Sequence, residues 1–231
     1  MENKWVLITG SSTGLGKELA LAFAKNKYNI IIHGMNSARL EEVRREIINC
    51  NVECEVIDGD LVLESTIEKL SEIAVEKNID ILINNAALGN IKNFADYYEK
   101  EIIDELAVDL IAPIKLAKRI YPIMIKKGNG FIVNINSFDG LKVNGNGKTA
   151  YSTAKFGLKG FTDSLRFEAK KNNVKVFGVY LGGMKTEMYS RNAGDNTKCM
   201  DPCEVARIIF DSCKDYSSTC VDEIVIGRIL Y

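Results

Sequence analysis

Histidine is almost missing from this chain, because His33 is the only one in 231 residues. The six cysteines lie at positions 50, 54, 199, 203, 213 and 220 and therefore have no histidine near them. A structural zinc site would need two distant C-x3-C pairs to converge. We expect no metal site. In a reducing compartment we also expect unpaired thiols, because disulfides are rare there.

Long hydrophobic runs and an excess of either charge are also lacking. No apolar stretch reaches the roughly 20 residues that span a bilayer. The N-terminus, Met1 to Lys4, leads directly into a strand pattern without the features of a signal peptide. The 30 basic and 31 acidic residues nearly cancel, which argues against nucleic acid or an anionic membrane as a partner. We expect a cytoplasmic protein.

The remaining composition is typical of a globular α/β protein. Hydrophobic residues make up 46% of the chain, enough for a sizeable core. Strand patterns alternate with helical ones, and we expect strands near 4–8, 28–33, 52–57, 80–83, 131–135, 174–181 and 222–226. This order predicts a doubly wound, Rossmann-type parallel sheet of about seven strands between two helix layers. We expect one domain over 1–231, with helices at 96–106 and 109–127 and a polar, mobile flap at about 187–200.

A glycine-rich turn follows the first strand pattern, with glycines at positions 10, 14 and 16. Its spacing is G-x-x-x-G-x-G, which differs from the common dinucleotide fingerprint. It is not a P-loop either, because Lys17 is followed by Glu18 where magnesium binding needs Ser or Thr. The first amides of the following helix favour an anion at this turn. A glycine-rich turn without any ligand is the alternative.

Tyr151 and Lys155 lie four residues apart in a long helical pattern, so they share one helix face. A lysine ammonium beside a phenol favours the phenolate and lowers the tyrosine pKa. A phenol tuned in this way is a useful general acid or base. Ser137, at the end of the preceding strand pattern, adds a third polar group. On spacing alone, an ordinary exposed tyrosine and lysine is the commoner explanation.

In combination, these motifs resemble the short-chain dehydrogenase/reductase family, in its compact single-domain branch. The resemblance rests on Thr9-Gly10-x-x-x-Gly14-x-Gly16, Asn84-Asn85-Ala86, Ser137 and Tyr151-x-x-x-Lys155. It implies an NAD(P)-dependent oxidoreductase that moves a hydride between nicotinamide and a small carbonyl or alcohol substrate. Tyr151 is then the general acid or base, Lys155 lowers its pKa, and Ser137 orients the carbonyl.

The resemblance also implies a cofactor site and an assembly. The cofactor residues would be Gly10, Ser12, Thr13, Gly14, Leu15, Gly16, Asn36, Arg39, Asp60, Leu61, Asn85, Ala86, Ala87, Tyr151, Lys155, Gly182, Met184 and Thr186. Family members pair through the helices expected at 109–127 and 150–171, so we expect a homodimer or homotetramer.

Three positions depart from the family pattern. Asp109 replaces the asparagine that assists the lysine, Leu181 replaces a proline, and Ala87 replaces a glycine. Asp109 can accept hydrogen bonds and favours a charged Lys155. We therefore include it in the catalytic set, while lower activity or a shifted pH optimum stays open.

The choice of cofactor depends on the end of the second strand. Gly34 stands where an NAD-binding acid is usual, and Met35 stands where an NADP-binding arginine is usual. Arg39, Lys17, Asn36 and Ser37 are near enough in sequence to donate to a phosphate. NADP(H) is therefore expected over NAD(H), although Arg39 and Lys17 also suit a solvated helix face.

Two other functions remain to be distinguished. A cofactor-binding regulatory protein without turnover is compatible with Asp109 and Leu181. A methyltransferase on a similar sheet would leave the spacing of Tyr151 and Lys155 unexplained.

Overall fold

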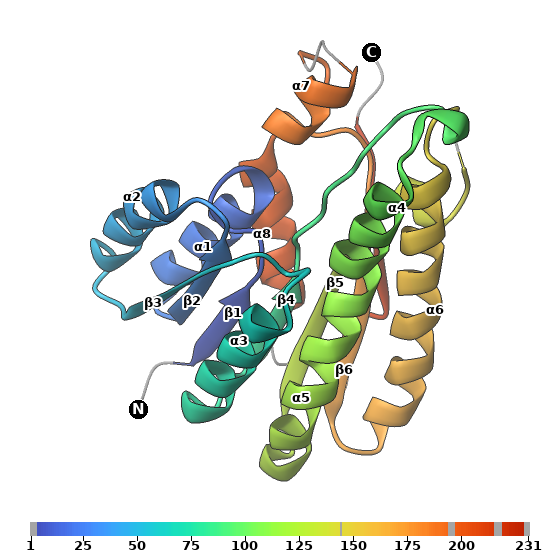
Figure 1. Ribbon diagram of the computed structural model, residues 1–231. Coiled ribbons are helices and arrows are strands. Elements are labelled where there is room, and N and C mark those ends of the chain that lie inside the picture. Colours follow the sequence, from blue (N-terminus) through green and yellow to red (C-terminus); the bar gives the residue numbers. More distant parts are fainter. Residues whose placement is uncertain (1–3, 144, 194–196, 215–218, 229–231) are drawn as a thin grey trace.

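The computed structural model describes residues 4–143, 145–193, 197–214 and 219–228. Within these residues, seven parallel strands form one sheet in the order β3-β2-β1-β4-β5-β6-β7 (Figure 1). The strands are β1 (Trp5–Ile8), β2 (Asn29–Gly34), β3 (Cys54–Asp58), β4 (Ile81–Asn84), β5 (Gly130–Ser137), β6 (Val174–Leu181) and β7 (Glu223–Ile226). The order reverses between β1 and β4, as in doubly wound folds. The predicted fold class is confirmed.

Helices cover both faces of the sheet. They are α1 (Gly14–Lys25), α2 (Ser37–Ile48), α3 (Glu64–Glu76), α4 (Glu99–Leu106), α5 (Ala112–Lys127), α6 (Thr149–Lys170), α7 (Glu187–Ala193) and α8 (Pro202–Ser212), with short 3-10 turns at Phe94–Asp96 and Phe138–Gly140. Helices α1, α2 and α8 pack on one face. Helices α3, α5 and α6 lie on the other, where α4 packs on α6. Helix α7 lies above one end of the sheet (Figure 1).

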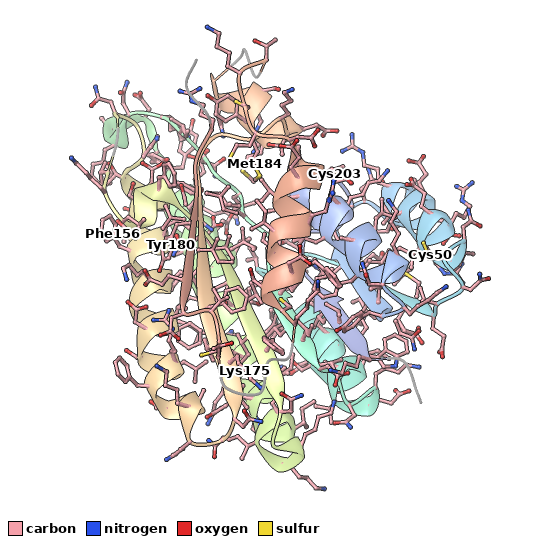
Figure 2. The ribbon with its side chains drawn as sticks, turned by 180° about the vertical axis from the view of Figure 1, so that it is seen from behind. Cys50, Phe156, Lys175, Tyr180, Met184 and Cys203 are labelled. Carbon is pink, nitrogen blue, oxygen red and sulfur yellow. The ribbon has the colours of Figure 1, made fainter. Side chains whose placement is uncertain are left out.

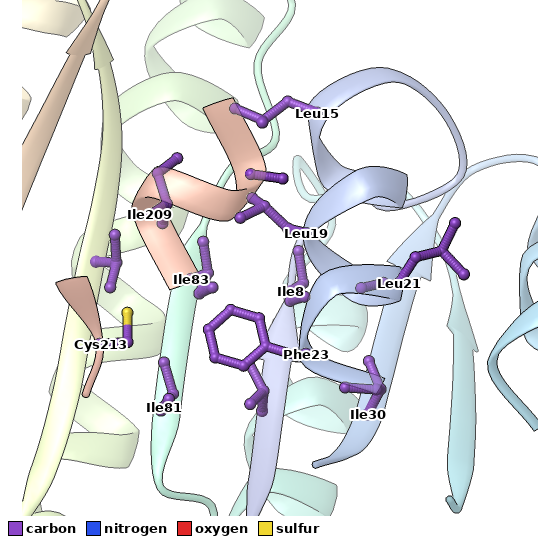
Figure 3. Close-up of a cluster of buried hydrophobic side chains, with 14 of the residues drawn as sticks. Ile8, Leu15, Leu19, Leu21, Phe23, Ile30, Ile81, Ile83, Ile209 and Cys213 are labelled. Carbon is purple, nitrogen blue, oxygen red and sulfur yellow. The ribbon is translucent and has the colours of Figure 1, made fainter. Parts of the chain in front are cut away.

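The strands are apolar on both sides, because each face of the sheet meets a helix layer. In β1, Val6 and Ile8 point to the α1 face, whereas Leu7 points to the α5 face. Figure 3 shows the hydrophobic cluster on the α1 side of the sheet, to which Phe23 of α1, Ile209 of α8 and Ile83 of β4 belong. This alternation at a period of two fixes which side chains each helix layer covers.

The parallel register brings all strand ends to one edge. Leu82 of β4 pairs with Leu7 of β1 on one side and with Ile132 of β5 on the other. Figure 2 shows the direction of β6, from Lys175 at one end to Met184 just beyond the other, near Cys203 of α8. In doubly wound folds the edge at the carboxyl ends binds ligands.

Buried amides connect the centre of the sheet to α6. Asn84 Nδ2 donates to Asn134 Oδ1 at 2.8 Å, and Asn134 Nδ2 donates to Thr162 Oγ1 at the same distance. All three residues are buried, where a hydrogen bond is worth more because the alternative is an unsatisfied polar group. These bonds align α6 with the ends of β4 and β5.

Two segments differ from the sequence-based expectations. The helices expected at 96–106 and 109–127 form one rod, because a π-helical turn at Ala107–Ile111 joins α4 to α5. The segment expected as a mobile flap at about 187–200 begins with α7, its residues 194–196 lie outside the described ranges, and its mobility stays a prediction. None of the helices in the described ranges combines the length and the apolar character that crossing a bilayer requires.

His33 connects the glycine-rich turn to the end of β3. Its Nδ1 accepts the Gly10 N–H at 3.3 Å, and its Nε2 lies 3.1 Å from the Gly59 carbonyl oxygen. These contacts fit a neutral ring with its hydrogen on Nε2. Burial lowers the pKa of His33 to about 4.

His33 makes stability depend on pH. The unfolded chain takes up the proton near pH 6.5, whereas the folded chain resists it down to about pH 4. Between pH 7 and pH 5, acidification should therefore remove about 2 kcal/mol of unfolding free energy through this residue.

The variant His33→Gln should lose less stability over this range, since glutamine does not titrate. Urea unfolding of both proteins at pH 7 and pH 5 measures the difference, and the carboxylates contribute equally to both. Identical pH dependence in the two proteins would contradict the assignment.

Candidate active site

The carboxyl ends of the strands open onto a cleft of about 1100 Å³. Every residue predicted to bind the cofactor lines it, and so does Ser137. Asp109 is the one predicted site residue outside the lining, because it is wholly buried behind Lys155. The structure therefore brings the predicted site residues together from the ends of six strands, β1 to β6.

The Asn84-Asn85-Ala86 segment holds the glycine-rich turn in place. Thr9 Oγ1 accepts the N–H groups of Asn85 and Ala86 at 3.0 and 3.1 Å. Asn85 Nδ2 donates in return to the carbonyl oxygens of Thr9 and Gly10, at 2.9 and 3.0 Å. The turn after β1 is thus fixed to the end of β4.

Two glycines allow this close packing. Gly10 has a φ of +64°, and a Cβ there would lie 2.8 Å from the Ala86 Cα. A Cβ on Gly16 would lie 2.2 Å from the Gly10 carbonyl oxygen. Any side chain is therefore excluded at both positions. The N-terminal amides of α1 face a turn that offers a cradle for an anion.

Ser137, Tyr151 and Lys155 meet on one wall of the cleft. Ser137 ends β5, and its side chain lies close enough to Tyr151, in the first turn of α6, to act on the pKa of that phenol. Lys155 follows one turn later, with its Nζ 5.5 Å from the Tyr151 ring centroid. Asn136 Nδ2 donates to the Lys155 carbonyl oxygen at 3.0 Å and so fixes α6 against β5.

The pKa of Tyr151 differs from the expectation drawn from sequence. Burial raises this pKa, and the Asp109 carboxylate adds to the rise. The Lys155 ammonium acts in the opposite direction, as expected, but does not outweigh burial. The net direction is upward, so the prediction of a lowered pKa is wrong for the protein without bound ligand.

Asp109 pairs directly with Lys155. Asp109 Oδ1 lies 3.3 Å from Lys155 Nζ, and both side chains are buried. Burial acts to lower the pKa of Lys155, but Asp109 and Tyr151 outweigh it, so that pKa is raised. Lys155 is therefore held as an ammonium ion beside the phenol of Tyr151.

The end of β2 carries the residues predicted to select the cofactor. Asn36 caps α2 by accepting the Arg39 N–H at 3.0 Å. The Arg39 guanidinium pairs with Glu187 of α7 at 2.9 Å, and both side chains line the cleft. Lys17, the other candidate cation, pairs with Glu46 on α2.

Several residues of the site were not predicted from sequence. Asp139 donates its N–H to Ser137 Oγ at 3.1 Å and pairs with Lys148 at 2.9 Å, and both line the cleft. Glu105, one helical turn before Asp109, is wholly buried. Acids at positions 101, 104 and 109 flank Glu105, so the sequence carries no signal that sets it apart from an exposed acid.

Helix α7 closes over the cleft. Arg191 Nη2 donates to the Leu88 carbonyl oxygen at 2.8 Å, and Asn192 Nδ2 donates to that of Gly89 at 2.6 Å. Thr186 Oγ1 accepts the Tyr189 N–H at 3.2 Å and so orients the first turn of α7. The segment expected as a flap is thus attached to the loop after β4.

Comparison with known proteins gives consistent results. The family model for short chain dehydrogenases matches residues 4–196. The 3-oxoacyl-[acyl-carrier-protein] reductase FabG of Aquifex aeolicus is 32% identical, over 97% of this chain and 96% of its own. The oxidoreductase UcpA of Salmonella typhimurium is 29% identical, over 81% of this chain and 72% of its own.

A solved structure shares the fold over nearly its whole length. The alcohol dehydrogenase of Thermococcus sibiricus, complexed with 5-hydroxy-NADP, matches with a TM-score of 0.89 at 22% identity, covering 98% of this chain and 97% of that one. The family match, the curated relatives and the geometry of the cleft agree, and this chain belongs to the short-chain dehydrogenase family of oxidoreductases.

Proposed function

We propose that this protein is an NADP(H)-preferring oxidoreductase that interconverts a carbonyl and an alcohol on a small molecule, with Tyr151 as general acid and base. The observation that carries the proposal is the convergence of Ser137, Tyr151 and Lys155 in a cleft that the glycine-rich turn also lines. An isolated Y-x-x-x-K pair would not explain this arrangement.

Each residue has a distinct part in the proposed reaction. The nicotinamide cofactor, when bound, supplies or accepts the hydride. In reduction, Tyr151 gives its proton to the carbonyl oxygen, and in oxidation it takes the proton back. Ser137 donates a hydrogen bond to the same oxygen and stabilises its developing negative charge. The Lys155 ammonium limits the cost of forming the Tyr151 phenolate.

The cradle of the glycine-rich turn fits the pyrophosphate of a dinucleotide. The amides at the start of α1 can bind an anion, and Gly10 and Gly16 allow the close backbone packing that shapes this turn. The preference for NADP(H) rests on Gly34 and Arg39, which place no acid and one cation at the end of β2. The relative from Thermococcus sibiricus was solved with an NADP derivative. A 2′-phosphate here would compete with Glu187 for Arg39.

Fluorescence titration with NADPH and NADH tests the cofactor proposal. We expect NADPH to bind at least about tenfold more tightly, which corresponds to about 1.4 kcal/mol. The variant Arg39→Ala should remove most of this difference by weakening NADPH binding alone. Lys17→Ala is the matched control, because Lys17 pairs with Glu46 and does not line the cleft. If neither nucleotide binds, the proposed function is wrong.

Tyr151→Phe should abolish turnover on any ketone or aldehyde that the wild type reduces. We expect kcat to fall by a factor of about 100 or more, the usual contribution of a general acid. The dissociation constant for NADPH should stay within about threefold, since the aromatic ring is retained. Stopped-flow and equilibrium titration separate the two effects. Tight cofactor binding by the wild type without turnover on a broad substrate panel would instead support a regulatory protein.

Asp109→Asn tests the electrostatic assignment. The Asp109 carboxylate helps to raise the pKa of Tyr151, so its neutralisation should lower that pKa. Reduction requires the protonated phenol, and its rate falls as pH rises through the pKa. The alkaline limb of the reduction profile should therefore move to lower pH in the variant. A limb that stays in place, or that moves to higher pH, would contradict the assignment.

A further inference from the structure

Helix α4 buries an acid where other helices bury apolar residues. Of its eight residues, Glu105 alone is fully buried. Asp109, one turn later in the π-helical segment, is also fully buried, and its proximity helps to raise the pKa of the Glu105 carboxyl. Two carboxyl groups therefore share a buried site with one cation, the Lys155 ammonium.

The charges of this group balance only if one carboxyl keeps its proton. Two buried carboxylates in contact repel each other, and one ammonium compensates only one of them. Asp109 is the carboxyl that contacts Lys155. Burial together with Asp109 raises the pKa of Glu105 and favours its neutral form. Tyr97 and Lys155 are the other titratable groups that feel its charge.

A proton on Glu105 also satisfies a buried acceptor. Within the described residues, Asp109 Oδ1 has no N–H or hydroxyl donor in hydrogen-bond geometry, although Lys155 Nζ lies 3.3 Å away. A neutral Glu105 can donate its O–H to the Asp109 carboxylate, and a buried acceptor left without a donor is costly.

The two acids also bind three consecutive backbone amides. Asp109 Oδ2 accepts the Leu88 N–H at 3.2 Å, and Glu105 accepts those of Gly89 and Asn90 at 3.0 and 3.1 Å. We call residues 88–90 the strap. Leu88 and Gly89 also line the cleft.

The carbonyl side of the strap receives α7. Leu88 and Gly89 accept hydrogen bonds from Arg191 and Asn192, and a Cβ on Gly89 would lie 2.9 Å from Met188 Sδ. The N–H groups of the strap thus bind the acids next to Lys155, and its carbonyl groups bind the helix that covers the cleft.

We propose that Glu105 is a positioning residue of this active site: as a neutral acid hydrogen-bonded to Asp109, it fixes the strap on which α7 docks over the substrate. The kinetic part of this inference rests on the proposed function, whereas the structural part does not. Glu105 touches neither cofactor nor substrate and acts through the strap.

Four variants separate this role from general stability. Glu105→Leu fills the space but leaves the Gly89 and Asn90 amides without an acceptor. Glu105→Gln keeps a donor towards Asp109 and one acceptor for the strap. Glu99→Gln, on the exposed side of α4, is the matched control. Asn192→Ala weakens the same docking from the α7 side without disturbing the buried acids.

We expect the variants that loosen the strap to change KM more than kcat. Glu105→Leu and Asn192→Ala should raise KM for the carbonyl substrate about tenfold or more, with a smaller change in kcat. Both should leave the NADPH dissociation constant within about threefold. Glu105→Gln should restore KM to near the wild-type value, and Glu99→Gln should match the wild type.

Hydrogen exchange supplies a readout that needs no turnover. The amides of Gly89, Asn90 and α7 should exchange faster in Glu105→Leu than in Glu105→Gln. If α7 exchange is unchanged in Glu105→Leu, or KM is unchanged in Asn192→Ala, the positioning role is wrong. If Glu105→Gln behaves like Glu105→Leu, Glu105 is not a neutral donor. A wild type without turnover but with the expected exchange pattern would overturn the proposed function and leave the positioning role standing.

Discussion

A buried ammonium ion needs a nearby negative charge, and the rest of the site depends on the ion pair that meets this need at Lys155. Only 3% of the Lys155 side chain is exposed, and Asp109 provides the compensating carboxylate. Compensation has a second effect, because a neutralised ammonium stabilises the Tyr151 phenolate less than a lone one would. The Lys155 ammonium therefore interacts with both Asp109 and Tyr151, and the pKa of the Tyr151 phenol depends on how strongly it interacts with each.

The ion pair is effective because the surrounding backbone cannot move away from it. The register of β4 and β5 and the Asn84–Asn134–Thr162 hydrogen bonds fix α6 against the sheet. Asn136 then fixes the turn of α6 that carries Lys155. On the other side of the cleft, the Thr9 and Asn85 bonds hold the glycine-rich turn to the same strand end. Hydrogen bonds between strand ends thus hold the site residues in place more precisely than loops alone would.

Sequence reasoning reached the fold and most of the site because the signals are local. The spacing of Gly10, Gly14 and Gly16, and the four-residue step from Tyr151 to Lys155, each describe one turn or one helix face. The Asp109 departure was visible in the same way. The catalytic roles, the homo-oligomeric assembly and the single-domain organisation stay predictions.

Other features depend on contacts between distant segments and could not be predicted. Arg39 and Glu187 are 148 residues apart in sequence, and neither segment contains a pattern that predicts their ion pair. The upward pKa of Tyr151 results from burial, which depends on the packing of the whole cleft. The role of Glu105 requires knowledge of which backbone amides lie next to α4. In each case the property depends on which residues are neighbours in three dimensions, and residue type alone does not reveal this.

The π-helical turn at Ala107–Ile111 sets the rotation between α4 and α5, which pack on different helices. Upstream of the turn, α4 packs on α6, and downstream of it, α5 packs on α3. Because successive helical residues are offset by about 100° around the axis, the loss or gain of one residue in this turn would rotate α4 against α5 by that angle. Glu105 would then face away from Lys155 while α5 stayed in place. The length of this five-residue segment is therefore under a tighter constraint than the identity of its apolar residues.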